Sequence, residues 1–281
     1  MDAQLTVDGR ERTYTVIGEE ASARARALVL VLHGSRQDGR AHHRFAGGQY
    51  DALAGPEVVV AYLDGVGGFW NDARRQSTSI ARRRDVDDVG FVDAVIERLA
   101  ASHGIDRRRV YAVGFSNGGQ MVMRLLHERP ALLAGAAVVA ATLPDPDSFL
   151  LPQTGVTPHP VPIMLVHGDA DPISPYAGGP FRWWARRAFG VGGAMRSVAD
   201  TAAYFARRNG ISAAPATSQW RGADGMAIRR TEFPDAAAPV VAYTVAGGGH
   251  TVPGPAAAPR IVGRTATGMT VADAMRELFA L

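Results

Sequence analysis

The sequence predicts an α/β protein with a mostly parallel central sheet and helices on both faces. Apolar, strand-like runs alternate with helical stretches along the 281 residues, which is typical of this class. Several runs read as buried strands, and three of them end in polar residues. Open α/β sheets bind ligands outside the carboxyl ends of their strands, so these residues could meet at one edge. Strands are expected near 28–32, 58–63, 110–114, 136–140, 162–166 and 240–245.

The N-terminal half begins with a predicted hairpin. Residues 5–17 are expected to form two strands that turn at Asp8-Gly9, because this dipeptide favours a tight turn. A helix is expected over 85–103, with Asp85 and Asp88 as a capping pair. Its apolar positions are Val89, Val92, Ile96 and Leu99.

The C-terminal half ends in a predicted helix from about Thr270 to Ala280. The proline-rich stretches 144–162 and 252–259 are expected to be loops near the mouth of a site, since neither looks like a linker. Residues 1–281 are therefore expected to form a single domain. The apolar positions of the last helix are Val271, Met275, Leu278 and Phe279.

Residues 110–118 join a strand-like run to a Gly-x-Ser-x-Gly motif centred on Ser116. A serine at a sharp strand-to-helix turn is strained, and the flanking Gly114 and Gly118 let strand and helix approach closely. Such a motif also occurs in simple glycine-rich turns. The strand before it and the helical pattern after it favour a nucleophile at a helix N-terminus, where the helix dipole stabilises negative charge.

A carboxylate and a histidine follow Ser116 in the order nucleophile, acid, histidine. The strand near 162–166 ends in His167-Gly168-Asp169-Ala170-Asp171, and the strand near 240–245 ends in three glycines and His250. We predict Ser116, Asp171 and His250 as a catalytic triad for acyl transfer. Asp169 is the alternative acid, but it directly follows the Gly168 turn and is expected to hold the loop backbone. The glycines before His250 are interpreted as a flexible presentation of its ring.

An oxyanion formed during acyl transfer needs two N–H donors. The first is predicted to be the backbone N–H of Asn117, directly after the nucleophile, and the second that of Ser35, after the strand near 28–32. An ordinary strand-to-loop turn is the alternative for Ser35, and His33 is expected to shape this loop. The other histidines have simpler interpretations: His42 and His43 in a solvated polar loop, His103 and His127 near helix ends. No metal-ligand spacing joins them, so no metal site is expected.

Six groups of residues resemble a known family when taken together and in order. They are Leu32-His33-Gly34, Asp64-Gly65 with Phe69-Trp70-Asn71-Asp72, the run 85–92, Gly114-Phe115-Ser116-Asn117-Gly118-Gly119, the 167–171 run with Pro175-Tyr176, and Gly247-Gly248-Gly249-His250-Thr251. The chain resembles the α/β-hydrolase superfamily and, within it, the bacterial polyhydroxybutyrate depolymerase and feruloyl-esterase-like family. The resemblance implies the same triad and the hydrolysis of carboxylic esters, including feruloyl esters and hydroxyalkanoate polyesters. Secreted members commonly carry a signal peptide and disulfides, and this chain shows neither. Members also often have a tryptophan after the His-Thr pair, where this chain has Val252.

Residues 177–196 follow the acid loop and are the least familiar segment. Glycine pairs bracket four aromatic residues, as expected for a hinged lid; a short surface helix packed on the core is the alternative, and both stay open. An aromatic, covered pocket is expected, which should accept short acyl and aryl esters better than an insoluble polymer. The expected lining residues are Trp70, Tyr176, Trp183, Trp184 and Val252.

The composition excludes several function classes. The chain has no cysteine, which removes disulfide, thiol and zinc-thiolate chemistry. Its 30 basic residues, all arginine, are scattered among 27 acidic ones without an aromatic-interleaved stripe, so no nucleic-acid partner is expected. The longest apolar run, 132–143, is too short to span a membrane, and no signal pattern opens the chain. A soluble, cytoplasmic protein is expected, with a signal removed from the sequence as the alternative; the oligomeric state is open.

Taken together, the motifs predict a serine carboxylic-ester hydrolase that works through an acyl-enzyme without cofactor. The expected substrates are small or aromatic esters, feruloyl-like or short acyl, or a hydroxyalkanoate polyester. A serine peptidase could use the same triad, because amides and esters share the tetrahedral route, but no peptide-capturing domain is evident. A non-catalytic binding protein is the third hypothesis, although binding alone would need none of the three triad residues.

Overall fold

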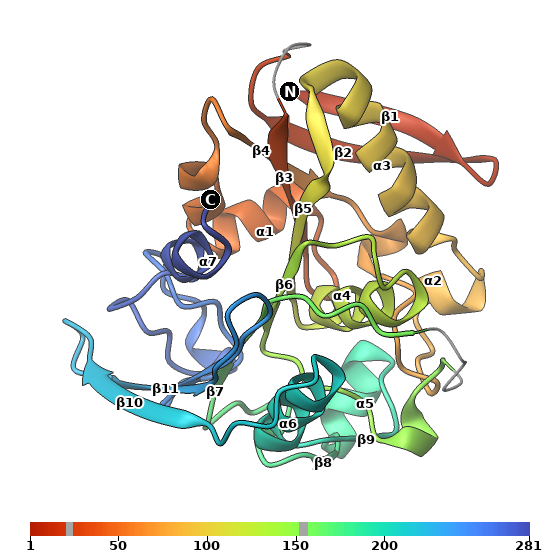
Figure 1. Cartoon of the computed structure of the whole chain (residues 1–281). Coiled ribbons are helices and arrows are strands. Elements are labelled where there is room, and N and C mark those ends of the chain that lie inside the picture. Colours follow the sequence, from red (N-terminus) through yellow and green to blue (C-terminus); the bar gives the residue numbers. More distant parts are fainter. Residues whose placement is uncertain (21–24, 152–156) are drawn as a thin grey trace.

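A twisted sheet of ten strands forms the centre of the computed structural model, which describes residues 1–20, 25–151 and 157–281 (Figure 1). The strands of the sheet are β1 (Asp2–Val7), β2 (Arg10–Ile17), β3 (Arg26–Leu32), β4 (Val58–Leu63), β5 (Ile105–Phe115), β6 (Gly135–Val139), β7 (Ile163–Gly168), β10 (Ala216–Arg221), β11 (Ala227–Phe233) and β12 (Val240–Val245). Their order across the sheet is β1-β2-β4-β3-β5-β6-β7-β12-β11-β10. The strands from β4 to β12 in this order run parallel, and an antiparallel hairpin closes each edge. The mostly parallel sheet is confirmed.

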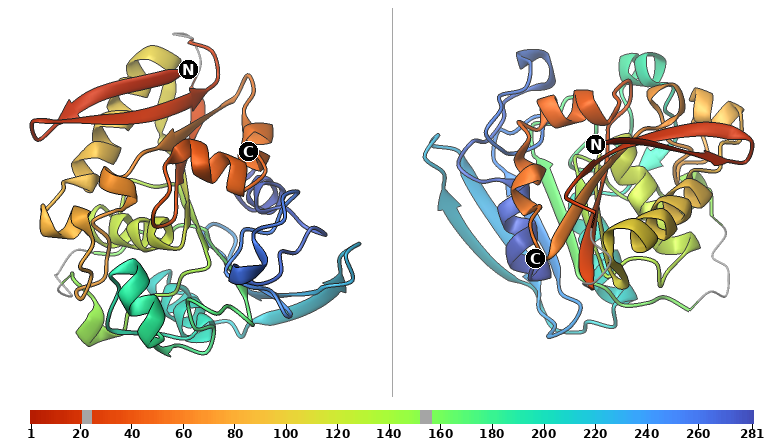
Figure 2. Two further views of the ribbon diagram at one scale, coloured as in Figure 1. Left: turned by 180° about the vertical axis from the view of Figure 1, so that it is seen from behind. Right: turned by 90° about the horizontal axis from the view of Figure 1, so that it is seen from above.

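Helices cover both faces of the sheet, as Figure 2 shows in its view from above. The helices are α1 (Gly39–Phe45), α2 (Ile80–Arg83), α3 (Asp88–His103), α4 (Asn117–Glu128), α5 (Trp183–Phe189), α6 (Val198–Arg208) and α7 (Val271–Phe279). Side chains of α3, α4 and α6 pack on one face, and those of α7 pack on the other together with the short turn Gln49–Leu53. A small two-stranded sheet, β8 (Gly179–Pro180) and β9 (Ala194–Met195), lies on either side of α5 in the sequence.

The central strands are buried on both faces, which explains their unbroken apolar sequences. In β3, Leu28 and Leu30 point to the α3 and α4 face, whereas Val29 and Val31 point to the α7 face. All seven residues of β3 are buried. Parallel strands between two helix layers have continuous apolar sequences rather than alternating ones. The positions of these strands could therefore be predicted from the sequence.

Several elements differ from the sequence prediction. The hairpin β10–β11 and the helices α1 and α6 were not predicted. Helix α3 begins at Asp88 and is capped by Asp87, whose side chain accepts a hydrogen bond from Gly90 N–H at 2.8 Å. The expected capping pair of Asp85 and Asp88 is wrong, because the buried Asp88 carboxylate instead pairs with Arg12 at 2.7 Å.

The histidines in the 39–45 segment also differ from expectation. His42 was predicted in a solvated loop, but it lies in α1 and is only 1% exposed. Its ring stacks with those of Phe45 and Phe115, at 6.2 and 5.7 Å between centroids. His43 is partly exposed and lies 2.8 Å from Asp51. The sequence could not show these aromatic neighbours, because Phe115 is far away along the chain.

No helix in the described ranges is long and apolar enough to cross a membrane. The predicted loops at 144–162 and 252–259 contain no strand in the part that the structure describes. Residues 152–156 of the first stretch lie outside the described residues.

Candidate active site

Ser116 occupies a strained turn between β5 and α4. Its backbone has φ 53° and ψ −112°, a left-handed conformation that is rare for a residue with a side chain. A Cβ atom at Gly114 would overlap with Gly118 O, and one at Gly118 would overlap with Leu32 O. Gly114 is therefore needed for the close approach of β5 and α4, and Gly118 for the close approach of α4 to the end of β3. A hydrogen bond from Ser116 N–H to Val139 O, at 2.8 Å, helps to hold the turn.

The structure brings Ser116, His250 and Asp171 together from the ends of β5, β12 and β7. His250 Nε2 lies 2.9 Å from Ser116 Oγ, and His250 Nδ1 lies 2.7 Å from Asp171 Oδ2. Because the carboxylate can only accept, Nδ1 carries the proton and Nε2 is left to accept one from the serine. The three side chains thus form one hydrogen-bonded chain in the direction that acyl transfer needs.

The two candidate acids have different partners. Asp171 Oδ1 accepts hydrogen bonds from the backbone N–H groups of Ile173 and Ser174, both at 2.8 Å, while Oδ2 faces His250. Asp169 instead accepts from Gly247 N–H at 2.6 Å and so ties the acid loop to the loop before His250. Of the two aspartates, Asp171 thus contacts His250, and Asp169 holds the loop backbone.

The glycines before His250 serve close packing rather than flexible presentation. A Cβ atom at Gly168 would overlap with Gly248 O, and one at Gly249 would overlap with Val262 O. The loops after β7 and β12 and the chain near 262 therefore press against one another. His250 N–H donates to Val262 O at 2.7 Å, which fixes the backbone at the histidine itself.

A second histidine lies against Asp171. Nε2 of His167 is 3.0 Å from Ser174 O and 3.2 Å from Asp171 Oδ2, so the proton of the ring must be on Nε2. Burial alone would raise the pKa of the Asp171 carboxyl, but the rings of His250 and His167 outweigh it and hold the pKa well below the usual range. Asp171 is therefore ionised across the neutral range. The four-residue spacing of His167 and Asp171 was a signal that sequence reasoning did not use.

The loop after β3 lies beside Ser116 and offers one N–H group. Gly34 N–H is bound by Gln37 Oε1 at 3.0 Å, and Arg36 N–H donates to Gly68 O at 2.7 Å. Between them, Ser35 N–H has no acceptor among the described residues, and Ser35 lines the same cavity as Ser116. His33 does shape this region: its Nδ1 faces Gly34 O at 2.7 Å, and its Nε2 accepts from Gly65 N–H at 2.9 Å.

A cavity of about 140 Å³ opens at Ser116. Its walls are mainly apolar and come from the loop after β3, the acid loop, the 181–191 stretch and residue 262. The lining residues are Ser35, Gln37, Phe45, Arg74, Phe115, Ser116, Gln120, Ala140, Ala141, Ile173, Ser174, Phe181, Phe189, Val191, His250 and Val262.

None of the five expected substrate-binding residues lines this cavity. Trp70 is fully buried, and its indole N–H donates to His33 O at 2.9 Å. Val252 is also buried, whereas Trp183 is 77% exposed on the outer side of α5. Tyr176 directs its hydroxyl to Thr244 Oγ1 at 2.8 Å. Trp184, half-buried, is the remaining member. The aromatic wall of this cavity is built instead by Phe45, Phe115, Phe181 and Phe189.

The 177–196 segment forms one wall of the cavity through Phe181, Phe189 and Val191. Backbone hydrogen bonds pin its second half to the body of the protein: Gly190 O accepts from Thr78 N–H at 2.8 Å, and Ala194 O accepts from Asp145 N–H at 3.0 Å. The segment therefore contains a short helix, as one interpretation of the sequence expected, and it also forms a wall of the cavity, as the lid interpretation expected. In the described parts of the chain, no three His, Asp or Glu side chains lie together in a way that could hold a metal ion.

The chain is similar to known proteins in sequence and in fold. A family model described as phospholipase/carboxylesterase matches residues 14–181. The putative esterase NocK of Nocardia uniformis subsp. tsuyamanensis is 35% identical over 284 residues, covering 96% of this chain and 79% of that protein. A probable feruloyl esterase C of Aspergillus niger is 25% identical over 166 residues, 58% of this chain and 50% of that protein.

Among solved structures, an acetyl xylan esterase from Aspergillus awamori covers 100% of this chain and 99% of its own, with a TM-score of 0.62 and 15% identity. This likeness concerns the fold alone. The finer resemblance to polyhydroxybutyrate depolymerases stays a prediction. The extent of the family match and the identity to the Nocardia protein over nearly the whole chain place this protein in the phospholipase/carboxylesterase family of the α/β-hydrolase superfamily, a family of ester hydrolases.

Proposed function

We propose that this ester hydrolase is a serine carboxylesterase with Ser116 as nucleophile, His250 as general base and Asp171 as the acid of the triad. The hydrogen-bonded chain from Ser116 Oγ through the two nitrogens of His250 to Asp171 Oδ2 is the observation that carries the proposal. Such a chain at the mouth of a mainly apolar cavity suits acyl transfer, because a nucleophile, its base and the group that orients the base are all in contact.

In the first half of the reaction, Ser116 Oγ attacks the ester carbonyl carbon and His250 Nε2 takes its proton. The tetrahedral oxyanion is held by the N–H groups of Asn117 and Ser35, which have no acceptor in the described chain. Asn117 is the first residue of α4, where backbone N–H groups lack helical partners and the helix dipole favours an anion. His250 then protonates the leaving alcohol, and the acyl group remains on Ser116.

In the second half, water replaces the alcohol. His250 removes a proton from water, the hydroxide attacks the acyl carbon, and Ser116 leaves with the proton returned from His250. The Asp171 carboxylate stabilises the imidazolium that forms in both halves, and its two backbone hydrogen bonds keep it in place.

The cavity supports small acyl or aryl esters as substrates rather than polymers. Its apolar wall of Phe45, Phe115, Phe181 and Phe189 suits a short hydrocarbon or ring, and the stretch 181–191 covers one side. The names of the similar proteins, a putative esterase, a feruloyl esterase and an acetyl xylan esterase, are compatible with such substrates. No contact in the described residues favours a peptide or an insoluble polyester.

Replacing the nucleophile tests this proposal. Ser116→Ala should lower kcat for 4-nitrophenyl acetate and butyrate by about 10³-fold or more, because loss of a triad member removes the covalent route. A fluorophosphonate should label the native protein at Ser116 and leave the variant unlabelled. Ser218→Ala, on the exposed strand β10, is the matched control and should behave like the native protein. Activity retained in Ser116→Ala, or labelling elsewhere, would refute the mechanism.

A further inference from the structure

Among the described residues that line the cavity, Arg74 is the one with a permanent charge. Its side chain is almost fully buried, and its guanidinium lies 5.9 Å from the ring centroid of Phe181 on the cavity wall. None of the lining residues that the structure describes carries a carboxylate. A buried cation in a mainly apolar pocket is costly unless it is paired, so its partners decide what it can do.

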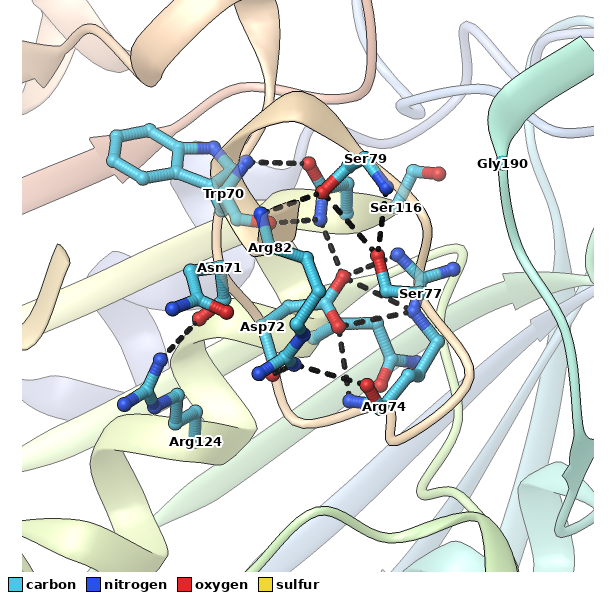
Figure 3. Close-up of polar contacts among 12 residues, drawn as sticks. Trp70, Asn71, Asp72, Arg74, Ser77, Ser79, Arg82, Ser116, Arg124 and Gly190 are labelled. Atoms are coloured by element: carbon cyan, nitrogen blue, oxygen red, sulfur yellow. Dashed lines mark hydrogen bonds and ion pairs between the residues drawn. The ribbon is translucent and has the colours of Figure 1, made fainter. Parts of the chain in front are cut away.

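Asp72 pairs with Arg74 from behind. Arg74 Nε lies 3.2 and 3.0 Å from the two Asp72 carboxylate oxygens, and Nη2 also contacts Oδ2 (Figure 3). These bonds use one edge of the guanidinium. Nη1, on the other side, has no hydrogen-bond partner among the described residues, and it is not sealed from solvent. Arg74 therefore presents an open pair of N–H donors on a rigidly held group.

Asp72 also binds groups other than the guanidinium of Arg74. Asp72 also accepts from Asn117 Nδ2 and from Arg74 N–H, so its lone pairs are shared with neutral donors. A second guanidinium, that of Arg82, donates to Asp72 O and to Arg74 O. The guanidiniums of Arg74 and Arg82 thus both lie close to Asp72, and Asp85 is a second acidic residue near Arg82. Figure 3 shows this cluster next to the turn that carries Ser116.

Residues 177–196, which we call the covering segment, are positively charged. Residues 177–196 contain arginines and no acidic residue. Arg182 directly before α5 and Arg186 and Arg187 within it are exposed. Phe181 and Phe189 of the same segment line the cavity wall. Positive charge on a segment that forms one cavity wall attracts anions toward this side of the molecule.

We propose that Arg74 selects esters whose acyl part carries a second, ionised carboxyl group, that is, half-esters of small dicarboxylic acids. The proposal rests on the proposed function. The free carboxylate accepts hydrogen bonds from Arg74 Nη1, while the methylenes between the two carboxyl carbons contact the aromatic wall. A purely hydrocarbon acyl group of the same size expels water from Nη1 and leaves its N–H groups without acceptor, which penalises that substrate.

Three acyl groups of nearly equal shape test this. Monoethyl succinate carries the carboxylate, ethyl 4-oxopentanoate a neutral carbonyl oxygen, and ethyl 4-methylpentanoate no acceptor; release of acid is followed at constant pH. The native protein should show kcat/KM at least about tenfold higher for the succinate than for the 4-methylpentanoate, as expected for a hydrogen bond between charged groups. Equal or reversed values would overturn the proposal. A 4-oxopentanoate as good as the succinate would also overturn it, because a neutral acceptor would then suffice.

Variants assign the preference to Arg74. Removing Arg74 alone would leave Asp72 buried and unpaired, so the double variant Asp72→Asn/Arg74→Met is compared with Arg74→Lys. The ratio of kcat/KM for succinate over 4-methylpentanoate should fall at least about tenfold in the double variant and be largely kept in Arg74→Lys. The ratio cancels any general loss of folded enzyme. An unchanged ratio in the double variant would overturn the assignment.

Labelling separates this proposal from the proposed function. If a fluorophosphonate fails to label Ser116 in the native protein, the serine mechanism itself is wrong. If Ser116 is labelled normally and the succinate shows no preference, the carboxylate selection alone is wrong.

Discussion

Asp169 and Asp171 stand two residues apart and have unlike surroundings. Asp171 has two backbone donors on one oxygen and His250 on the other, whereas Asp169 bonds a backbone N–H of the opposite loop. Sequence reasoning could favour Asp171, because its place deeper in the loop lets it turn toward His250. It did not find His167 beside Asp171: the spacing of four residues was a signal, but the contact itself depends on how the loop folds back.

Exchange of each aspartate for asparagine should separate their roles. Asp171→Asn should lower kcat by about 10³- to 10⁴-fold with the fold intact, because the amide allows the wrong tautomer of His250. Asp169→Asn should change kcat little and lower the melting temperature by a few degrees, about 1 kcal/mol, because it weakens the bond to Gly247 N–H. Stopped assays and thermal melts of both variants measure this. The reverse ranking would mean that Asp169 is the acid.

At the scale of elements, the sequence predicted the buried parallel strands but missed an exposed strand and the residues of the pocket wall. The parallel strands were placed within a few residues because both of their faces are buried. Strand β10 was missed because every residue in it is exposed, so no hydrophobic pattern marks it. The pocket wall was placed in the right segment, 177–196, but on Trp183 and Trp184 instead of Phe181 and Phe189. Which face of a seven-residue helix meets a cavity depends on loop geometry that periodicity does not encode.

The covering segment should control substrate preference but not the chemistry. Replacing 181–189 by a short glycine-serine loop removes Phe181 and Phe189 from the wall, so KM for butyrate esters should rise about tenfold or the preferred acyl length should change. Ser116 should still react with a fluorophosphonate. Trp183→Ala is the control, because this side chain is exposed and does not line the cavity. A substrate profile equal to that of the native protein would show that the segment is plain surface structure.

At the scale of the whole molecule, buried histidines couple folding to pH. Burial lowers the pKa of His42 to about 3, with the nearby His33 and His43 adding to the effect, and burial also lowers the pKa of His127 to about 4. The unfolded chain, with an ordinary histidine pKa near 6.5, binds protons below that pH that the folded chain does not bind. The free energy of unfolding should therefore fall as the pH drops from about 6.5 toward 4.

His42→Asn tests this coupling, because the amide can keep the hydrogen bond to Gln37 without titrating. The variant should be less stable than the native protein at pH 7.5, owing to the lost ring contacts. Between pH 6.5 and 5, however, its loss of stability should be smaller than that of the native protein by about 1–2 kcal/mol. Urea unfolding at four pH values measures both effects. Parallel pH profiles would contradict a buried, neutral His42.

The anchoring of the covering segment allows the substrate specificity of this enzyme to evolve separately from its catalytic site. The proposed catalytic side chains come from the ends of β5, β7 and β12, whereas the wall at 181–191 lies on a short excursion that backbone hydrogen bonds from Thr78 and Asp145 hold at its second half. Residues 181–189 lie before these two bonds in the sequence and belong to no strand of the central sheet. Mutations there can alter which acid is accepted while the catalytic residues keep their positions, so the excursion is the natural target for directed evolution of new specificities.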